Sequence, residues 1–263
     1  MRFCSLYSGS SGNALFIATD RTKLLLDAGL SGKKIVNALE LIGEDPATLS
    51  AIIVTHEHTD HSHGVGILAR KLKVPVYATG GTWKGMEWTV GKIVPELQHR
   101  FRLDRDFEIG DVAIHPFPIP HDAAEPVGMS FFADGRKLTI ATDIGHLNKQ
   151  LLECIGGSDL LLIESNHDVE MLKRGPYSDY LKARILGAYG HLSNESAGEA
   201  IVRAVHSGTR HVLLGHLSGE NNTPYLAYGC AEKTLKQEGV EIGKDVFLNV
   251  AQRGQVGQMI RLG

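Results

Sequence analysis

The chain has few cysteines and no long hydrophobic run. Its three cysteines, Cys4, Cys154 and Cys230, are odd in number and show no C-x-x-C spacing, so we expect neither a disulfide framework nor a cysteine-based zinc site. The longest apolar runs, such as 160–163, fall far short of the roughly 20 residues that a membrane span needs. The first residues also lack the apolar stretch of a secretory signal. These absences predict a cytoplasmic protein that does not act in a membrane.

No large excess of either charge is present. Lysine and arginine number 27 against 30 aspartates and glutamates, which gives a formal net charge of −3. Any nucleic-acid binding must therefore come from a local basic patch and not from the field of the whole molecule. With 43% hydrophobic and 22% charged residues the composition is that of an ordinary globular protein. No linker-like tract interrupts it, so we expect a single domain over residues 1–263.

Hydrophobic periodicity predicts two strand-rich halves, each accompanied by helices. Strands are expected at 2–7, 14–19, 23–27, 51–55 and 75–79, and then at 112–118, 127–133, 137–142, 159–164, 211–215, 246–250 and 256–261. Helices are expected at 32–42, 62–73, 177–188, 194–206 and 225–237. This order favours an α/β (α+β) fold, a four-layered αβ/βα sandwich in which two sheets pack face to face with helices outside.

Histidine is abundant and clustered. Of the 13 histidines, four fall within eight residues, in the string H-x-H-x-D-H followed by His63. The string directly follows a predicted strand, and strand alternation puts His56 and His58 on the same side, where both can reach one metal ion. Asp60 and His61 lie in the next turn and can reach a second ion. We expect His63 to face solvent.

Three further candidates stand at the ends of predicted strands: His121, Asp143 and His216. Two of them have an ordinary alternative, a surface loop histidine for His121 and a helix cap for Asp143. Together they supply imidazoles for each ion and a carboxylate able to bridge both. Nitrogen and oxygen donors suit zinc and manganese, so the expected cofactors are two divalent ions, Mn²⁺ or Zn²⁺. Such a pair can activate water and bind both oxygens of an in-line displacement.

Two more strings carry acid–base residues. Glu164 ends a predicted strand, and His191 precedes a predicted helix. As a pair, Glu164 would keep His191 protonated, and His191 would donate that proton to a leaving alkoxide; a strand-end cap and a loop histidine are the alternatives. The helix start at Ser193 and Asn194 offers free amides to a phosphate.

A basic stretch runs from Lys173 and Arg174 to Arg184 and contains Tyr177, which can stack on bases. It flanks His191, so we expect Lys173 and Arg174 to bind substrate. A solvated helix face explains the same residues equally well.

The whole set of strings resembles the metallo-β-lactamase-fold hydrolases. The resemblance covers essentially the whole chain, including Leu24–Gly29 with Asp27. It implies that His56, His58 and His121 hold one metal, that Asp60, His61 and His216 hold the other, and that Asp143 bridges them. It also implies that Asp27 supports the ligand histidines by hydrogen bonds. With Asp60 also counted as catalytic, the expected catalytic residues are Asp60, His191 and Glu164.

Within that fold the chain looks like the WalJ/YycJ family. The strings that carry this likeness are Ser8–Asn13, Glu164–Asp168 and Gly190–Asn194. The family resemblance implies a cytoplasmic, metal-dependent 5′-to-3′ exonuclease that acts on DNA, with a role in DNA repair. RNA is not excluded as a substrate, and the oligomeric state is left open.

Two other functions remain compatible with the residues. One is a small-molecule hydrolase of the same fold that cleaves a cyclic phosphodiester or a thioester, the latter without need of Glu164 and His191 as a proton donor pair. The other is a non-catalytic metal-binding protein, which predicts a missing ligand; none is missing here.

Overall fold

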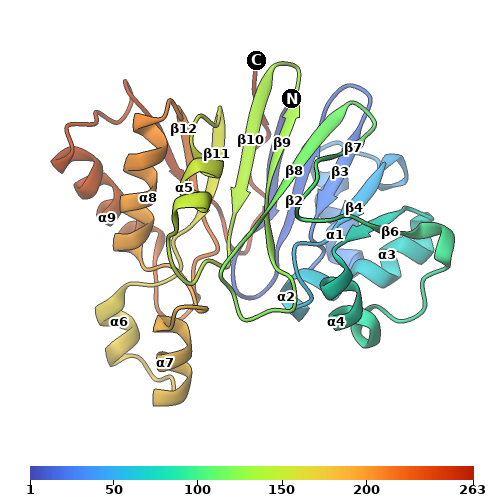
Figure 1. The fold of residues 1–263 in the computed structure, drawn as a ribbon, viewed down its shortest axis with the longest axis horizontal. Coiled ribbons are helices and arrows are strands. Elements are labelled where there is room, and N and C mark those ends of the chain that lie inside the picture. Colours follow the sequence, from blue (N-terminus) through green and yellow to red (C-terminus); the bar gives the residue numbers. More distant parts are fainter.

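Two seven-stranded sheets face each other in the middle of the molecule, with helices on the outer side of each (Figure 1). The computed structural model describes all residues 1–263. The first sheet has the order β14-β1-β2-β3-β4-β5-β6 and the second the order β13-β12-β11-β10-β9-β8-β7. This is the metallo-β-lactamase fold, a mixed α/β sandwich of four layers, as the sequence predicts.

The bounds of the strands are β1 (Arg2–Tyr7), β2 (Ala14–Ala18), β3 (Lys23–Leu26), β4 (Ala51–Ile53), β5 (Val76–Ala78), β6 (Gln98–Arg100), β7 (Phe107–Ile109), β8 (Val112–Pro118), β9 (Val127–Ala133), β10 (Arg136–Ala141), β11 (Leu160–Glu164), β12 (His211–Gly215), β13 (Phe247–Val250) and β14 (Ile260–Arg261). The helices are α1 (Gly32–Leu41), α2 (Thr59–Ser62), α3 (Val65–Leu72), α4 (Gly80–Val90), α5 (Lys149–Ile155), α6 (Val169–Arg174), α7 (Asp179–Leu186), α8 (Asn194–His206) and α9 (Pro224–Gln237). Pro46–Thr48 and Pro95–Leu97 form short 3-10 helices. No helix is both long and apolar enough to cross a membrane.

Three hydrophobic layers hold the sandwich together, and strand alternation explains them. In β3, Leu24 and Leu26 point into the core between the sheets, whereas Leu25 points outward to the helices of the first sheet. In β11, Leu162 lies in the same central core, and Leu161 packs among residues of α8 and α9. These strands are buried on both faces, which is why their sequences are continuous apolar runs without polar alternation.

Parallel pairing brings the ends of the central strands to one edge. β3, β4 and β5 run parallel in the first sheet, and β10, β11 and β12 run parallel in the second. The residues that follow these strands therefore gather along a single edge of the sandwich, the lower edge in Figure 1, where α2 and α7 also lie. Asp27, His56, Asp143 and His216 all follow such strands.

Several elements differ from the prediction. The helix expected over 62–73 is two helices, α2 and α3. They are separated at Gly64, which packs so closely on the preceding loop that a side chain there would meet the Leu30 carbonyl oxygen at 2.3 Å. Of the strand expected at 256–261, only the last two residues form a strand, β14. Helices α4, α5 and α6 and strands β6 and β7 were not among the expected elements. α4 contains three glycines, and the other four elements are only three to seven residues long.

Candidate active site

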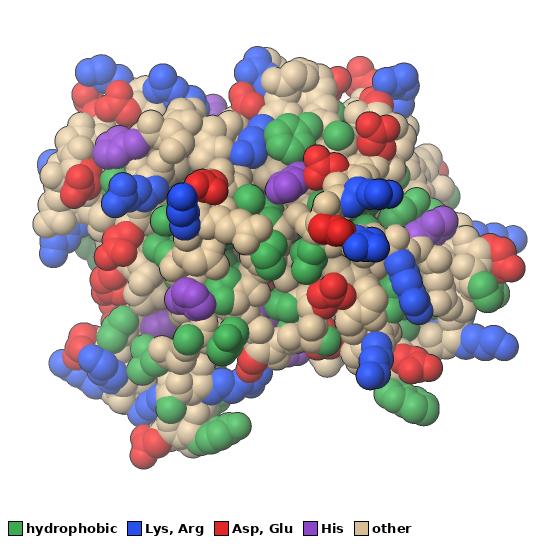
Figure 2. Space-filling view, viewed as in Figure 1, with side chains coloured by type: hydrophobic (Ala, Val, Ile, Leu, Met, Phe, Trp, Pro, Cys, Tyr) green, Lys and Arg blue, Asp and Glu red, His purple; other side chains and the backbone are tan.

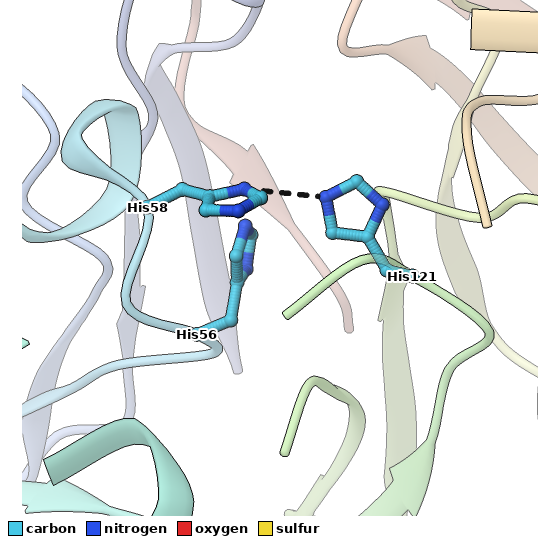
Figure 3. Close-up of side chains that lie close together, drawn as sticks. All are labelled: His56, His58 and His121. Atoms are coloured by element: carbon cyan, nitrogen blue, oxygen red, sulfur yellow. Dashed lines mark hydrogen bonds between the residues drawn. The ribbon is translucent and has the colours of Figure 1, made fainter. Parts of the chain in front are cut away.

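Three histidines from two loops converge beside the ends of β4 and β8. His56 and His58 come from the segment after β4, and His121 comes from the loop between β8 and β9 (Figure 3). Their nearest ring nitrogens all lie within 4.8 Å of one another. His121 Nδ1 lies 3.2 Å from the Gly190 carbonyl oxygen, to which it donates, so Nε2 is left to face the other two rings, 3.3 Å from His58 Nδ1.

A second group adjoins the first. Asp60, His61 and His216 offer one atom each within 4.8 Å of one another. Asp143 lies between the two groups: Oδ2 is 3.4 Å from His61 Nε2, and Oδ1 is 3.4 Å from His216 Nε2 and 3.8 Å from His121 Nε2. All seven residues predicted as ligands are thus in one cluster, and His63 is exposed outside it.

Asp27 holds one ring of the cluster, that of His61, by a hydrogen bond. Its Oδ2 lies 2.8 Å from His61 Nδ1, and its Oδ1 accepts a hydrogen bond from the Thr55 amide at 2.8 Å. A carboxylate on Nδ1 fixes the orientation of the ring and leaves Nε2 for a ligand. The next residues, Ala28 and Gly29, pack backbone to backbone against the segment of Asp60, since a side chain at Gly29 would meet the Asp60 carbonyl oxygen at 1.6 Å.

The donor set fits a bound metal. Several buried polar atoms in the cluster have no hydrogen-bond partner: His56 Nε2, Asp143 Oδ2 and both ring nitrogens of His216. Leaving such atoms buried and unpaired is costly, and native proteins avoid it unless a ligand satisfies them. Nitrogen and carboxylate oxygen atoms that converge in this way are the donors that divalent zinc and manganese accept.

The pKa shifts of the cluster residues also favour a bound metal. Burial holds the pKa of His56 well below its ordinary value and also lowers that of His216. Burial alone would raise the pKa of Asp143, but His216 and His61 hold it well below its usual range. Neutral imidazoles and an ionised carboxylate are the forms that bind metal. Burial would also lower the pKa of His61, yet Asp143, Asp27 and Asp60 raise it to about 10, a sign of buried negative charge that a cation would neutralise.

Glu164 and His191 form a pair next to this cluster. His191 Nδ1 lies 2.7 Å from Glu164 Oε1, and Glu164 Oε2 accepts from the amides of Ile144 at 2.7 Å and Leu192 at 3.1 Å. Burial alone would lower the pKa of His191, but the Glu164 carboxylate raises it to about 9. Ligating atoms of the pair also lie within 4.8 Å of those of Asp143 and His216. A protonated imidazole therefore stands at the edge of the cluster.

Comparison with known proteins agrees with this geometry. Residues 22–217 match the β-lactamase superfamily domain, a range that contains the whole cluster. The chain belongs to this superfamily. It is 42% identical to exodeoxyribonuclease WalJ of Streptococcus pneumoniae over 93% of this chain and 91% of that protein. It is 40% identical to exodeoxyribonuclease YycJ of Bacillus anthracis over 93% of this chain and 92% of that protein.

A solved structure shows the same fold at low identity. Zn²⁺-bound PqqB from Methylobacterium extorquens superposes with a TM-score of 0.73 at 17% identity, covering 100% of both chains. The resemblance predicted from the sequence is thus confirmed: the chain is a metal-dependent hydrolase of the β-lactamase superfamily and belongs to its WalJ/YycJ family.

The site of this superfamily member opens into a pocket of about 300 Å³. Cluster residues and His191 form its floor, and the helix α7 forms one wall. Its lining also includes Ser10 and Asn166, and the residues Tyr177 and Arg184 of the basic stretch noted in the sequence. Two further lining residues, Asp122 and Ser218, were not singled out from the sequence. Only their position in the fold reveals them, since short loops after distant strands bring them together.

The four predicted substrate-binding residues do not line this pocket. Ser193 caps α8, and Asn194 is buried, with its side chain bonded to Ser165 and Asn222 and its amide donating to the carbonyl oxygen of His167 at 2.9 Å. Two of the amides at the helix start that the sequence led us to expect for a phosphate are thus already bonded, that of Asn194 to His167 and that of Ser196 to the Ser193 hydroxyl.

Lys173 and Arg174 lie in the last turn of α6, exposed, and both contact Glu170. Figure 2 shows basic side chains in this part of the surface, over α6 and α7, with acidic ones among them. Neither residue lines the pocket.

Proposed function

We propose that the chain is a dinuclear phosphodiesterase that degrades DNA as a 5′-to-3′ exonuclease in the cytoplasm. The observation that carries the proposal is the Glu164–His191 pair at 2.7 Å beside a cluster of seven metal-binding side chains. A proton donor at this place serves a leaving group of high pKa, such as the alkoxide of a nucleotide. Likeness to the WalJ and YycJ exonucleases supports DNA as the substrate, and the family resemblance supports the polarity and a role in DNA repair.

In this proposal two divalent ions, Mn²⁺ or Zn²⁺, are held by the cluster. His56, His58 and His121 hold one, Asp60, His61 and His216 the other, and Asp143 both; Asp27 orients His61. When bound, such ions supply positive charge for the phosphate oxygens and lower the pKa of an attacking water. The three convergent groups of donors and the unpaired atoms among them support this assignment.

The chain's own acid–base work falls to His191. Its Nδ1 is bound by Glu164, so Nε2 is the atom that donates a proton to the leaving oxygen as the P–O bond breaks. Such general acid catalysis contributes roughly 10²–10⁴-fold. Glu164 raises the pKa of His191 to about 9, which keeps the donor charged at neutral pH. Asp60, which belongs to the second group of ligands, is also proposed as a catalytic residue. The proposal further includes a single domain over residues 1–263.

The small pocket favours one second candidate. A cavity of about 300 Å³ is at the low end of the size of small-molecule sites, so a cyclic phosphodiester fits it as well as the end of a DNA strand does. Both reactions need the metals and the donor, and only the substrate differs.

One assay separates the two. Single- and double-stranded DNA and RNA, labelled at the 5′ or the 3′ end, are incubated with Mn²⁺, Zn²⁺ or a chelator, and cyclic dinucleotides are tested alongside. Release of mononucleotides from the 5′ end of DNA, abolished by the chelator, is the expected result. Hydrolysis of the cyclic compound with DNA left intact contradicts the proposal. His63→Ala is the matched control for loss of a ligand, because His63 belongs to the same string but is exposed.

A further inference from the structure

Arg184 has an unusual position in the pocket. It lies on α7 and is the only lysine or arginine among the pocket-lining residues, which include Asp60, Asp122 and Asp143. A phosphodiester enters this pocket as an anion. Arginine is always charged and matches phosphate oxygens with its planar fork of donors, so Arg184 is the residue of the wall best suited to bind a phosphate.

Its guanidinium is held in place but mostly unused. Nε lies 2.5 Å from Asp122 Oδ2, and the two terminal nitrogens form no hydrogen bond within the protein. The side chain is 50% exposed, so these nitrogens are accessible. A guanidinium has five N–H donors, and Arg184 therefore keeps most of them for a ligand.

Asp122 connects Arg184 to the metal-binding cluster. It directly follows His121 in the chain, and its other oxygen, Oδ1, lies 3.4 Å from His121 Nε2. The carboxylate thus stands between the guanidinium and the cluster, and it holds Arg184 beside the metal-binding residues. By contrast, Lys173 and Arg174 pair with Glu170 and do not line the pocket.

We propose that Arg184 forms a second phosphate subsite, which binds the phosphate next to the scissile one. This inference rests on the proposed nuclease function and specifies its substrate further: a strand with at least two neighbouring phosphates. In a strand degraded from its 5′ end the neighbour is either the terminal 5′-phosphate or the second internucleotide phosphate. Both present the same oxygens to a guanidinium, and substrate chemistry distinguishes them.

Three thymidine pentanucleotides with the same first linkage test the subsite. One carries a 5′-phosphate, one lacks it, and one carries it but has a neutral methylphosphonate at the second linkage. We expect wild-type kcat/KM to fall roughly 10- to 100-fold on one of the two altered strands, the effect of losing a charge-assisted hydrogen bond. Arg184→Ala should cleave the complete strand as slowly as the wild type cleaves that altered strand. It should cleave the altered strand no more slowly still, because the mutation and the modification remove the same interaction.

Two variants exclude a merely structural effect. Arg184→Lys keeps the charge without the fork and should recover part of the discrimination between strands. Lys182→Ala removes a positive charge from the same helix, where Nζ bonds only the Lys173 carbonyl oxygen, and should discriminate as the wild type does. Metal content should be equal in all of them.

The outcomes separate the two proposals. If Arg184→Ala discriminates between the complete and the altered strands as strongly as the wild type does, the subsite is overturned and the nuclease function stays intact. So does a wild type that cleaves all three strands alike. A wild type that cleaves none of them, nor longer DNA, contradicts the proposed function itself.

Discussion

At the scale of single residues, the site is built from side chains in backbone conformations that most residues avoid. Five residues other than glycine have positive φ, and three of them belong to the cluster or its support: Asp27 at 60°, Asp143 at 61° and His216 at 54°. Each follows directly or closely on a central strand. Left-handed backbone at such residues costs about 1–3 kcal/mol and persists where the surroundings enforce it. The turn after each strand thus aims the side chain across the strand ends and into the site.

The role of His191 gives a prediction at this scale. His191→Ala should keep the bound metals but lose roughly 10²–10⁴-fold in the rate of DNA hydrolysis, since the leaving alkoxide then departs without a proton. A nitrophenyl phosphodiester, whose leaving group needs no proton, should be hydrolysed at close to the wild-type rate. Steady-state rates on both substrates, with metal analysis of the same preparations, check this. Equal losses on the two substrates would exclude His191 as the acid.

The Glu164–His191 pair also predicts a pH profile. The donor works only when protonated, and the pKa of His191 is raised to about 9, so DNA hydrolysis should hold at neutral pH and decline as the pH rises through about 9. In Glu164→Gln the main cause that raises the pKa of His191 is removed, while burial, which lowers it, remains. The alkaline decline should therefore move to lower pH. Profiles of kcat/KM for wild type and variant measure it, and an unmoved decline contradicts the pairing.

At the scale of elements, the loops after parallel strands matter more than the strands themselves. β3, β4, β10, β11 and β12 deliver their following residues to one edge. Two of these loops also touch backbone to backbone: Ala28 N donates to the His61 carbonyl oxygen and Gly64 N to that of Ala28, at 2.8 and 2.6 Å. Such close packing requires glycine at position 29, where the segment carrying Asp60 and His61 passes.

Gly29→Ala should therefore displace the second group of ligands. A methyl group 1.6 Å from the Asp60 carbonyl oxygen forces the backbone apart, and overpacking of this kind costs about 1–3 kcal/mol or more. We expect a lower free energy of unfolding and fewer bound ions per chain. Gly229→Ala is the control: it lies in α9 with open space around it and should be stabilised by roughly 0.5–1 kcal/mol. Equal stability of Gly29→Ala and wild type would refute the close approach of the two backbones.

The helix α6 supports a test of nucleic-acid binding. Its residues Lys173 and Arg174 are exposed, and each forms with Glu170 a surface ion pair of small energy. Reversing both charges should weaken DNA binding at low salt, and the log–log salt slope should fall by about 0.9 for each phosphate that the protein no longer neutralises. Hydrolysis of a small chromogenic phosphodiester should stay unchanged. Equal DNA affinity of variant and wild type would reduce these residues to a solvated helix face.

At the scale of the whole molecule, the site exists only where the two sheets meet. His56, His58 and His61 come from the first sheet, whereas Asp143 and His216 follow strands of the second. Ions shared by both halves would bind the folded chain and not the unfolded one, and would therefore stabilise the fold. The helices outside the sheets pack through separate hydrophobic layers. Two of them also contribute to the site: α2 carries Asp60 and His61, and α7 lines the pocket with Arg184.

The sequence predicts this arrangement in part, for physical reasons. Apolar runs buried on both faces identify the central strands, and the H-x-H-x-D-H string follows one of them, so fold and cluster are both visible in the chain. Asp122 is not, and neither is its pairing with Arg184, because that contact depends on the path of two segments 62 residues apart. The surroundings of the start of α8 escape the sequence for a similar reason: the donors of Asn194 are taken by distant residues, which no local pattern reveals.

Metal content tests the central claim most directly. Purified wild-type protein, analysed for its elements after dialysis against metal-free buffer, should retain two divalent transition-metal ions per chain. Asp143→Ala should retain fewer and lose its activity, and His63→Ala should retain two. A wild-type protein that binds no transition metal, or an Asp143→Ala variant with full metal content and full activity, would contradict the account of this site.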